Sequence, residues 1–458
     1  MKLKVQAKLD PQFTPLALVC REMREATMND GQDIVIGIER NKGYTTTYRT
    51  RIFKDGCGHD EENFKFVERI TKSLLWVAGG YKVIIAGSEV VGNKIKEAYT
   101  YGGLRDFDVH FMEKVYEDKF SVEIRALKDA PEDKSSAAPI GRHLDGCRIG
   151  FDAGGSDRKV SAVVNVESVY SEEVVWFPKI NSDPDYHYQG ILDAMKTAAS
   201  HMPRVDAIGV SSAGVYVDNR IMAASLFLKV NEEDFDKKVK NMYIDVAREI
   251  GENIPIEVAN DGDVTALAGA MDLNENAVLG IAMGTSEAGG YVDPQGNITG
   301  WLNELAFVPV DFCENAMVDE WSGDFGCGVK YFSQDGVIKL APFAGIELDE
   351  SLSPAEKLKV VQGLMKEGDE RAAAIYDTIG AYFGYAIAYY SEFYDIKHVL
   401  IMGRVTSGDG GVILLERAQE VLDKEFPELA KKIELHIPDE KSRRVGQSVA
   451  AASLPKIN

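Results

Sequence analysis

Two β-like runs lie near the amino end, at residues 34–38 and 44–48, on either side of Asn41-Lys42-Gly43. Strand-forming runs joined by asparagine and glycine are typical of a β-hairpin. A helical pattern, a short apolar run and a second helical pattern follow. Together they predict a mixed α and β domain. Its expected elements are a hairpin within 33–53, helices over 61–76 and 90–98, and a strand over 82–86, all within residues 1–126.

Residues 127–143 interrupt this pattern with a stretch that is polar, carries two prolines and contains few large apolar residues. Such a composition is typical of linkers, so we place a domain boundary there. Beyond it strands and helices alternate, which favours an α/β architecture. The expected elements are a hairpin over 146–166, a helix over 189–199, a strand over 205–211, a helix over 233–250 and a strand over 256–258.

A second group of elements repeats this plan, because the strands expected at 278–283 and 288–292 resemble the 146–166 hairpin. Helical patterns then cover 354–394, a strand follows at 398–402, and helical segments begin near Gly411 and Ser442. Two half-domains of similar design are implied. The expected division is a first lobe over 144–265, a second lobe over 266–441, and a carboxyl-terminal helix over 442–458 that packs back on the first lobe.

The composition and the net charge of the chain indicate which kinds of molecule it can bind. The chain has 458 residues, more than a single hydrophobic core usually serves, so two or three compact units are expected. Hydrophobic residues make up 45% and charged residues 27%, as in ordinary soluble proteins. The net charge of −22 repels nucleic-acid phosphates and anionic lipid. Small ligands are therefore the expected partners, without nucleic acid or membrane.

Targeting and redox signals point to the cytoplasm. Residues 1–8 have no apolar run after their charges, and no later stretch is long and apolar enough to cross a bilayer. The five cysteines are scattered and odd in number, and none belongs to a C-x-x-C pair. This usage suits a reducing compartment better than a disulfide framework.

A glycine-rich turn between two expected strands carries the first candidate chemistry, in Asp152-Ala153-Gly154-Gly155-Ser156. Paired glycines let backbone N–H groups approach phosphate oxygens, which a Cβ would obstruct. Asp152, at the end of its strand, is placed to hold Mg²⁺ through water, and Ser156 and Lys159 would add donors to the phosphates. The alternative is a hairpin whose Gly154 and Gly155 only turn the chain.

Two further glycine sites follow. In the run Gly284-Thr285-Ser286, hydroxyl and N–H groups suit the β- and γ-phosphates. Taken alone, this run is no better evidence for phosphate binding than any glycine-rich bend. Gly403 follows an apolar strand and opens a helix, where an adenosine can pack on the backbone. Each site is weak by itself, but the ordered set indicates ATP binding with Mg²⁺.

That order of motifs resembles the ROK family of sugar kinases and repressors, within the actin/hexokinase superfamily. The resemblance spans roughly residues 146–454 and leaves the region before the linker unexplained. It implies a duplicated ribonuclease H-like, actin-like ATPase fold with two lobes, an α/β fold, here joined to an additional amino-terminal α+β domain. The implied activity is phosphorylation of a sugar hydroxyl with ATP.

The resemblance also assigns roles to Asn260 and Asp261, which end an expected strand and begin a helix of small residues. Asn260 would hydrogen-bond a substrate hydroxyl, and Asp261 would accept its proton as catalytic base. The helix dipole favours a charged carboxylate at such a position, so it can act near neutral pH. The alternative makes Asp261 or Asp263 a simple N-cap.

The substrate pocket departs from the family pattern. Glu304 matches the family glutamate that grips sugar hydroxyls, although it is equally compatible with a solvated turn. Phe307 stands where the family has a zinc-binding histidine, and Cys313 and Cys327 stand alone instead of in a cysteine cluster. Two thiolates make a poor zinc site, so no structural zinc is expected. Packing of Phe307 and Trp321 would replace what zinc organises.

Residues 208–218 resemble the family's strand and glycine loop beside the substrate. A buried strand and turn explain most of this segment. Gly214 is predicted to lie beside the substrate, and no catalytic role is assigned to it.

Three functions remain to be distinguished. The leading hypothesis is an ATP-dependent sugar kinase. The second is a non-catalytic sugar sensor, without DNA binding because the amino-terminal region lacks an obvious helix-turn-helix and the chain is acidic. The third is another ATPase of the superfamily that holds an iron–sulfur cluster, against which the isolated cysteines argue. The role of residues 1–126 and a homodimeric state are left open.

Overall fold

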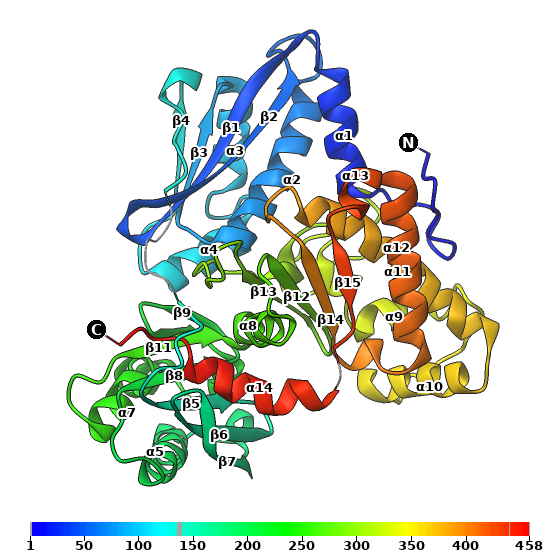
Figure 1. Ribbon diagram of the computed structural model, residues 1–458. Helices are drawn as coiled ribbons and strands as arrows, with labels where there is room; N and C mark the ends of the chain where they lie inside the picture. The colour runs from blue at the N-terminus through cyan, green and yellow to red at the C-terminus, as the bar shows by residue number, and fades with distance from the viewer. Residues whose placement is uncertain (1, 135–139, 439, 458) are drawn as a thin grey trace. The chain divides into compact units, whose positions relative to one another are not determined.

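The computed structural model describes residues 2–134, 140–438 and 440–457, and it divides the chain into two compact units (Figure 1). Residues 135–139 of the predicted linker lie outside the described residues. Within the described ranges, no helix combines the length and the apolar character that crossing a membrane requires. Unit 1 comprises residues 1–135, 281–289 and 301–437, and unit 2 comprises residues 136–280, 290–300 and 438–458.

Unit 2 is built on a five-stranded sheet with the order β11-β8-β5-β6-β7. β6 pairs antiparallel with β5 and β7, whereas β8 runs parallel to both β5 and β11. The predicted hairpin and strands are confirmed. β7 escaped prediction because most of its side chains are exposed and show no apolar alternation. The strands are β5 (Cys147–Ala153), β6 (Asp157–Val164), β7 (Glu167–Val175), β8 (Ala207–Ser212) and β11 (Ile256–Asn260).

Helices pack on both faces of this sheet. Ile149 and Phe151 of β5 join α5 and α7 in the core of unit 2, because alternate strand residues share a face. The opposite face carries α14, which packs on β5 and β8 (Figure 1). A Cβ on Gly209 would lie 1.6 Å from the Ala451 carbonyl oxygen, so only glycine permits this approach. The helices are α5 (Pro184–Ser200), α7 (Met242–Ile250), α8 (Asp261–Leu273) and α14 (Glu440–Ala452).

A second sheet, with the order β13-β12-β14-β15, belongs largely to unit 1. β14 and β15 run parallel. The helical stretch predicted over 354–394 is two helices, because Gly368 takes a φ of 77° and Asp369 caps the second helix. The elements are β12 (Val278–Met283), β13 (Glu287–Val292), β14 (His398–Met402), β15 (Glu434–His436), α9 (Gln334–Leu340), α10 (Pro354–Lys366), α11 (Glu370–Tyr390), α12 (Asp409–Glu425) and α13 (Pro427–Ala430).

The amino-terminal region forms its own sheet with the order β2-β1-β3-β4. The predicted hairpin is confirmed as the antiparallel pair of β1 and β2. β1 also pairs antiparallel with β3, whereas the comparable central pair of unit 2, β5 and β8, is parallel. This sheet is therefore not a copy of the one in unit 2. Its elements are α1 (Leu16–Ala26), β1 (Gly31–Arg40), β2 (Tyr44–Phe53), α2 (Asp60–Ala78), β3 (Lys82–Ala86), α3 (Glu89–Ala98), α4 (Asp106–Tyr116) and β4 (Ser121–Arg125).

Polar contacts join this region to later segments of unit 1. Arg24 of α1 forms a bidentate ion pair with Glu392, just beyond α11, with N–O distances of 2.7 and 2.9 Å. The backbone N–H of Glu304 donates to the Trp76 carbonyl oxygen at the end of α2, at 3.1 Å. The amino-terminal region thus supports the segment that carries the predicted sugar-binding glutamate.

Candidate active site

The predicted polar residues of unit 2 lie together at the carboxyl ends of three parallel strands. The register sets Asp152 of β5 beside Ser211 of β8, and Ser212 beside Asn260 of β11. The Ser211 hydroxyl donates to Oδ1 of Asp152 at 2.8 Å. Ligand sites of open α/β sheets occur at such strand ends, so the sheet itself gathers these side chains.

Asp152 is buried close to one cation. Nζ of Lys159 lies 3.9 Å from its Oδ2 and 2.9 Å from Oδ1 of Asp157. Burial raises the pKa of Asp152 to about 6, although the Ser211 hydrogen bond and Lys159 lower it, and the negative charge of Asp261 raises it further. A divalent cation would stabilise the ionised form, so Asp152 suits the Mg²⁺ role predicted for it.

Asn260, not Asp261 or Asp263, caps α8. Its Oδ1 accepts from the N–H of Gly262 at 2.7 Å, and its Nδ2 donates to the Gly214 carbonyl oxygen at the same distance. Gly214 therefore orients the asparagine amide. Asp261 begins the helix without serving as its N-cap, which removes the alternative that makes Asp261 only a capping residue.

The environment of Asp261 supports a base. Burial raises the pKa of its carboxyl, while the backbone N–H groups of Asp261 and Gly262 and the charge of Lys179 limit the shift. A raised pKa increases the proton affinity of the carboxylate, which a general base needs.

The glycine turn is held by two residues that the sequence did not indicate. Nε1 of Trp176 donates to the Gly154 carbonyl oxygen at 2.7 Å, and its backbone N–H donates to the Ser156 carbonyl at 3.1 Å. A Cβ on Gly155 would lie 2.7 Å from Cε and 2.9 Å from Nζ of Lys179. Lys179 follows the turn by more than twenty residues, so only the fold reveals the ammonium group beside it.

The second and third glycine sites lie together in unit 1. Gly284, Thr285 and Ser286 form the turn between β12 and β13. Gly403, at a φ of 100°, directly follows β14, and a Cβ there would lie 2.3 Å from the Met283 carbonyl oxygen. The close approach of the two segments explains why glycine stands at 403.

Two adjoining hollows open beside these turns and share Lys359, Gln362 and Ser407. The smaller, about 90 Å³, is lined by Gly284 and Thr285, and the larger, about 460 Å³, extends to Gly408–Gly410. Three cationic side chains and one carboxylate, that of Asp409, line them, and this local excess of positive charge suits an anionic ligand. The cations are Lys359, Lys366 and Arg404.

Glu304 directly precedes the short helix η6 (Leu305–Phe307) of unit 1, near a second glutamate that the sequence did not indicate. Glu287 is buried at the start of β13, and its Oε1 accepts from the Tyr390 hydroxyl at 3.2 Å. Burial raises the pKa of Glu287 to about 8, and the charge of Glu304 adds to the shift. The sequence signal that could have indicated Glu287 is a single carboxyl group at the start of an otherwise apolar strand.

Replacing Glu287 with glutamine is expected to stabilise the protein at pH 8. The pKa of Glu287 is about 8 in the folded protein and 4.5 in an ordinary glutamate, so the folded state holds the carboxyl proton more tightly than the unfolded state does. The folded state therefore loses stability as the pH rises from 4.5 to 8. The variant should gain about 1–3 kcal/mol in unfolding free energy at pH 8 and much less at pH 5. Urea unfolding at both values measures this. Glu347→Gln, at an exposed position, should show no such gain.

The residues at the family's zinc position do not fit that metal. The Cys327 thiol faces Oδ2 of Asp324 at 3.7 Å, and burial raises its pKa, which opposes the thiolate form. Among the described residues, neither Cys313 nor Cys327 belongs to a group of three convergent metal-ligating side chains. Phe307 instead packs on Trp76 and Trp321, with ring centroids 4.3 and 5.5 Å away.

Solved structures share this architecture. A ROK hexokinase from Thermus thermophilus matches with a TM-score of 0.51 and 17% identity, over 66% of this chain and 97% of its own. A ROK-family transcriptional regulator, a homologue of the E. coli MLC protein, matches with a TM-score of 0.52 and 16% identity, over 68% of this chain and 79% of its own. The chain has the ROK fold. The actin-like α/β fold that the motifs implied is thereby confirmed.

The ROK fold occurs in both an enzyme and a transcriptional regulator, so the fold alone does not distinguish a catalytic protein from a regulatory one. No protein-family model matches the chain, and no curated protein matches it. About a third of the chain lies outside the likeness to each ROK structure. The function must therefore be argued from the side chains of the site.

Proposed function

We propose that the protein transfers the γ-phosphoryl group of ATP to a hydroxyl group of a sugar or sugar derivative. The start of α8 is the observation that supports this most directly. The Asn260 side chain caps the helix, so the neighbouring Asp261 carboxylate is available as a base. Burial raises the pKa of the Asp261 carboxyl despite its contacts with the backbone N–H groups at the start of the helix, which increases its affinity for the substrate proton.

In the proposed reaction, Asp261 accepts the proton of the substrate hydroxyl as its oxygen attacks the γ-phosphorus. The bond from phosphorus to the β–γ bridging oxygen breaks, and ADP leaves. Asn260 positions the hydroxyl, since one N–H of its amide remains after the other donates to Gly214. Glu304 is assigned to a further sugar hydroxyl.

The phosphates require local positive charge against an overall charge of −22. In unit 2, backbone N–H groups of Gly154 and Gly155, the Ser156 hydroxyl and the ammonium group of Lys159 supply donors. Mg²⁺ held by Asp152 would supply further charge neutralisation for the phosphates when bound.

Unit 1 supplies the second set of nucleotide contacts in this proposal. The hydroxyl groups of Thr285 and Ser286 suit the terminal phosphates, in a turn that is closed by the hydrogen bond from the Gly284 N–H to the Ser286 carbonyl oxygen at 3.0 Å. The hollow of about 460 Å³, which is lined by Ser407 and residues 408–410, suits an adenosine.

A coupled assay of ADP release tests the proposal. Purified protein is incubated with ATP and Mg²⁺ against a panel of hexoses, amino sugars and polyols. ADP release that depends on one compound, with a phosphorylated product seen by mass spectrometry, is the expected result. ATP bound without ADP release across the panel would count against the kinase.

A sugar sensor is the second candidate, because a transcriptional regulator shares the fold at a TM-score of 0.52. It predicts saturable sugar binding without phosphorylation. Calorimetric titration of the same panel, with and without ATP, therefore distinguishes the two candidates.

Lys179→Gln is expected to raise the KM for ATP about 10-fold, the worth of one charge-assisted hydrogen bond, with a smaller effect on kcat. Its ammonium group lies over Gly155, where the phosphates are proposed to bind. Steady-state kinetics at varied ATP measures this. Lys196→Gln, an exposed lysine on α5, is the matched control and should leave KM unchanged. An unaltered KM in Lys179→Gln would remove this residue from the nucleotide site.

A further inference from the structure

Two histidines and a glutamate share one face at the edge of the second sheet, in unit 1. The parallel register sets His398, the first residue of β14, opposite Glu434, the first residue of β15. His436 lies two residues beyond Glu434, and alternate residues of a strand share a face. The sheet therefore brings three potential metal ligands together from two strands.

Their ligand atoms converge in pairs. Nδ1 of His398 lies 3.0 Å from Nε2 of His436 and 3.6 Å from Oε2 of Glu434. Nε2 of His436 lies 3.8 Å from the same glutamate oxygen. Ligands of a tetrahedral zinc ion with bonds near 2.05 Å are about 3.3 Å apart, so the triangle is close to one face of that tetrahedron.

We propose that His398, Glu434 and His436 bind a divalent transition-metal ion, with Zn²⁺ the best match. Two imidazoles and one carboxylate are the donor set that zinc accepts, whereas Mg²⁺ and Ca²⁺ take oxygen ligands. Water would complete the fourth position. Within the described residues, this is the single group of three or more such side chains whose ligand atoms all lie within 4.8 Å of one another.

Other histidine contacts on the protein differ from this one. His59 with Glu62 and His110 with Asp106 are exposed ion pairs of two residues on neighbouring helical turns. Near β15, a buried imidazole, a partly buried imidazole and an exposed carboxylate all direct ligand atoms to one point. A hydrogen bond between two histidines would not require the carboxylate oxygen to lie near both rings.

The site lies away from the proposed nucleotide contacts. His398 begins β14, whereas Gly403 directly follows its other end, and five residue steps of extended chain span roughly 16 Å. β15 has three residues and is the last strand before the chain passes from unit 1 into unit 2. A metal bridging β14 and β15 would fasten this short edge strand, and its binding would add to stability by mass action.

Zinc binding tests the inference independently of any kinase activity. The full chain, without an affinity tag and stripped with EDTA, is titrated with ZnCl₂ by calorimetry and with CoCl₂ by visible absorption. We expect one saturable site per chain, a tetrahedral Co²⁺ spectrum, and a Tm that rises with Zn²⁺ and falls again with EDTA.

Variants assign the ligands. His436→Gln and Glu434→Gln should weaken Zn²⁺ binding by more than about 100-fold, because loss of an outer-shell partner alone costs 10- to 100-fold. Their Tm without metal should stay near that of the wild type, since both residues are at least partly exposed. His201→Gln, which removes a histidine stacked on Tyr170 in unit 2, is the control and should bind Zn²⁺ normally. Absence of saturable binding by the folded wild type, or undiminished affinity in His436→Gln, would overturn the proposal.

Discussion

Asp261→Asn is expected to lower kcat for phosphoryl transfer by about 10²–10⁴-fold, the usual contribution of a positioned base. The substitution keeps the size of the side chain and leaves the Asn260 cap of α8 in place. Binding of ATP should change little, because the proposed nucleotide contacts do not include this carboxylate. The measurement is the single-turnover rate with the sugar identified from the panel, beside the KM for ATP.

The matched control is Asp272→Asn, at an exposed position in the last turn of the same helix, which should retain wild-type turnover. Far-ultraviolet circular dichroism and Tm establish that both variants fold. Turnover of Asp261→Asn within threefold of wild type would falsify the assignment of the base, although the sugar could still be bound there. An unreactive wild type that binds sugar would instead favour the sensor.

The sequence predicted the backbone of the candidate site well because its signals are local. The strands over 278–283 and 398–402 have the predicted boundaries, since each is a buried apolar run that ends just before a glycine. The register of parallel strands then brings Asp152 and Asn260 to one edge. Local sequence patterns, with the rule that parallel strands end at the same edge of a sheet, were sufficient to predict that these two side chains lie close together.

Other site residues could not be predicted, because their positions depend on contacts between distant segments. Lys179 follows Gly155 in sequence by two strands and a turn, yet its ammonium group lies beside that glycine. Trp176 has no local pattern that indicates a bond to the Gly154 carbonyl. Glu287 could not be predicted because its burial and its contact with Tyr390 of α11 depend on a segment about one hundred residues away.

The amino-terminal region takes on a physical role that the sequence left open. It shares unit 1 with residues 301–332, the segment that includes Glu304 and the family's zinc position. Trp76 of α2 packs on Phe307, and the predicted aromatic contact between Phe307 and Trp321 is confirmed. Residues 301–332 are therefore supported by α2 and by Phe107 and Phe111 of α4, whose rings also lie against Phe307.

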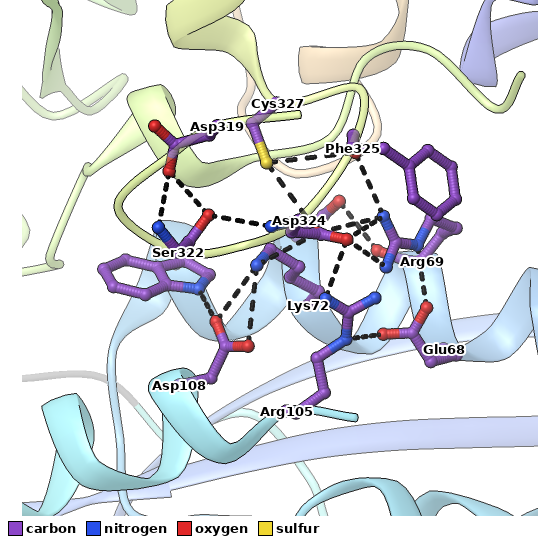
Figure 2. Close-up of polar contacts among 12 residues, drawn as sticks. Glu68, Arg69, Lys72, Arg105, Asp108, Asp319, Ser322, Asp324, Phe325 and Cys327 are labelled. Atoms are coloured by element: carbon purple, nitrogen blue, oxygen red, sulfur yellow. Dashed lines mark hydrogen bonds and ion pairs between the residues drawn. The ribbon is translucent and has the colours of Figure 1, made fainter. Parts of the chain in front are cut away.

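A buried network of charges completes this support (Figure 2). Asp324 contacts three cations, with N–O distances of 3.0 Å to Arg69, 3.1 Å to Lys72 and 2.9 Å to Arg105. Glu68 and Asp108 balance the remaining charge, and every side chain of the network is at most 4% exposed. The three cations belong to α2 and to the residue before α4, so Asp324 fixes the loop over 319–327 to the amino-terminal region.

Asp324→Asn is expected to destabilise unit 1 by about 3–5 kcal/mol, because it leaves three buried cations with two anions. Urea unfolding followed by tryptophan fluorescence measures this, since Trp76, Trp301 and Trp321 lie in unit 1. Removing a cation as well, in Lys72→Met with Asp324→Asn, restores the charge balance and should recover part of the loss. Asp30→Asn, from an exposed ion pair with Lys54 in the same unit, should have a far smaller effect. If Asp324→Asn unfolds at the wild-type urea concentration, the network does not hold the loop, and the aromatic contacts of Phe307 alone must position Glu304.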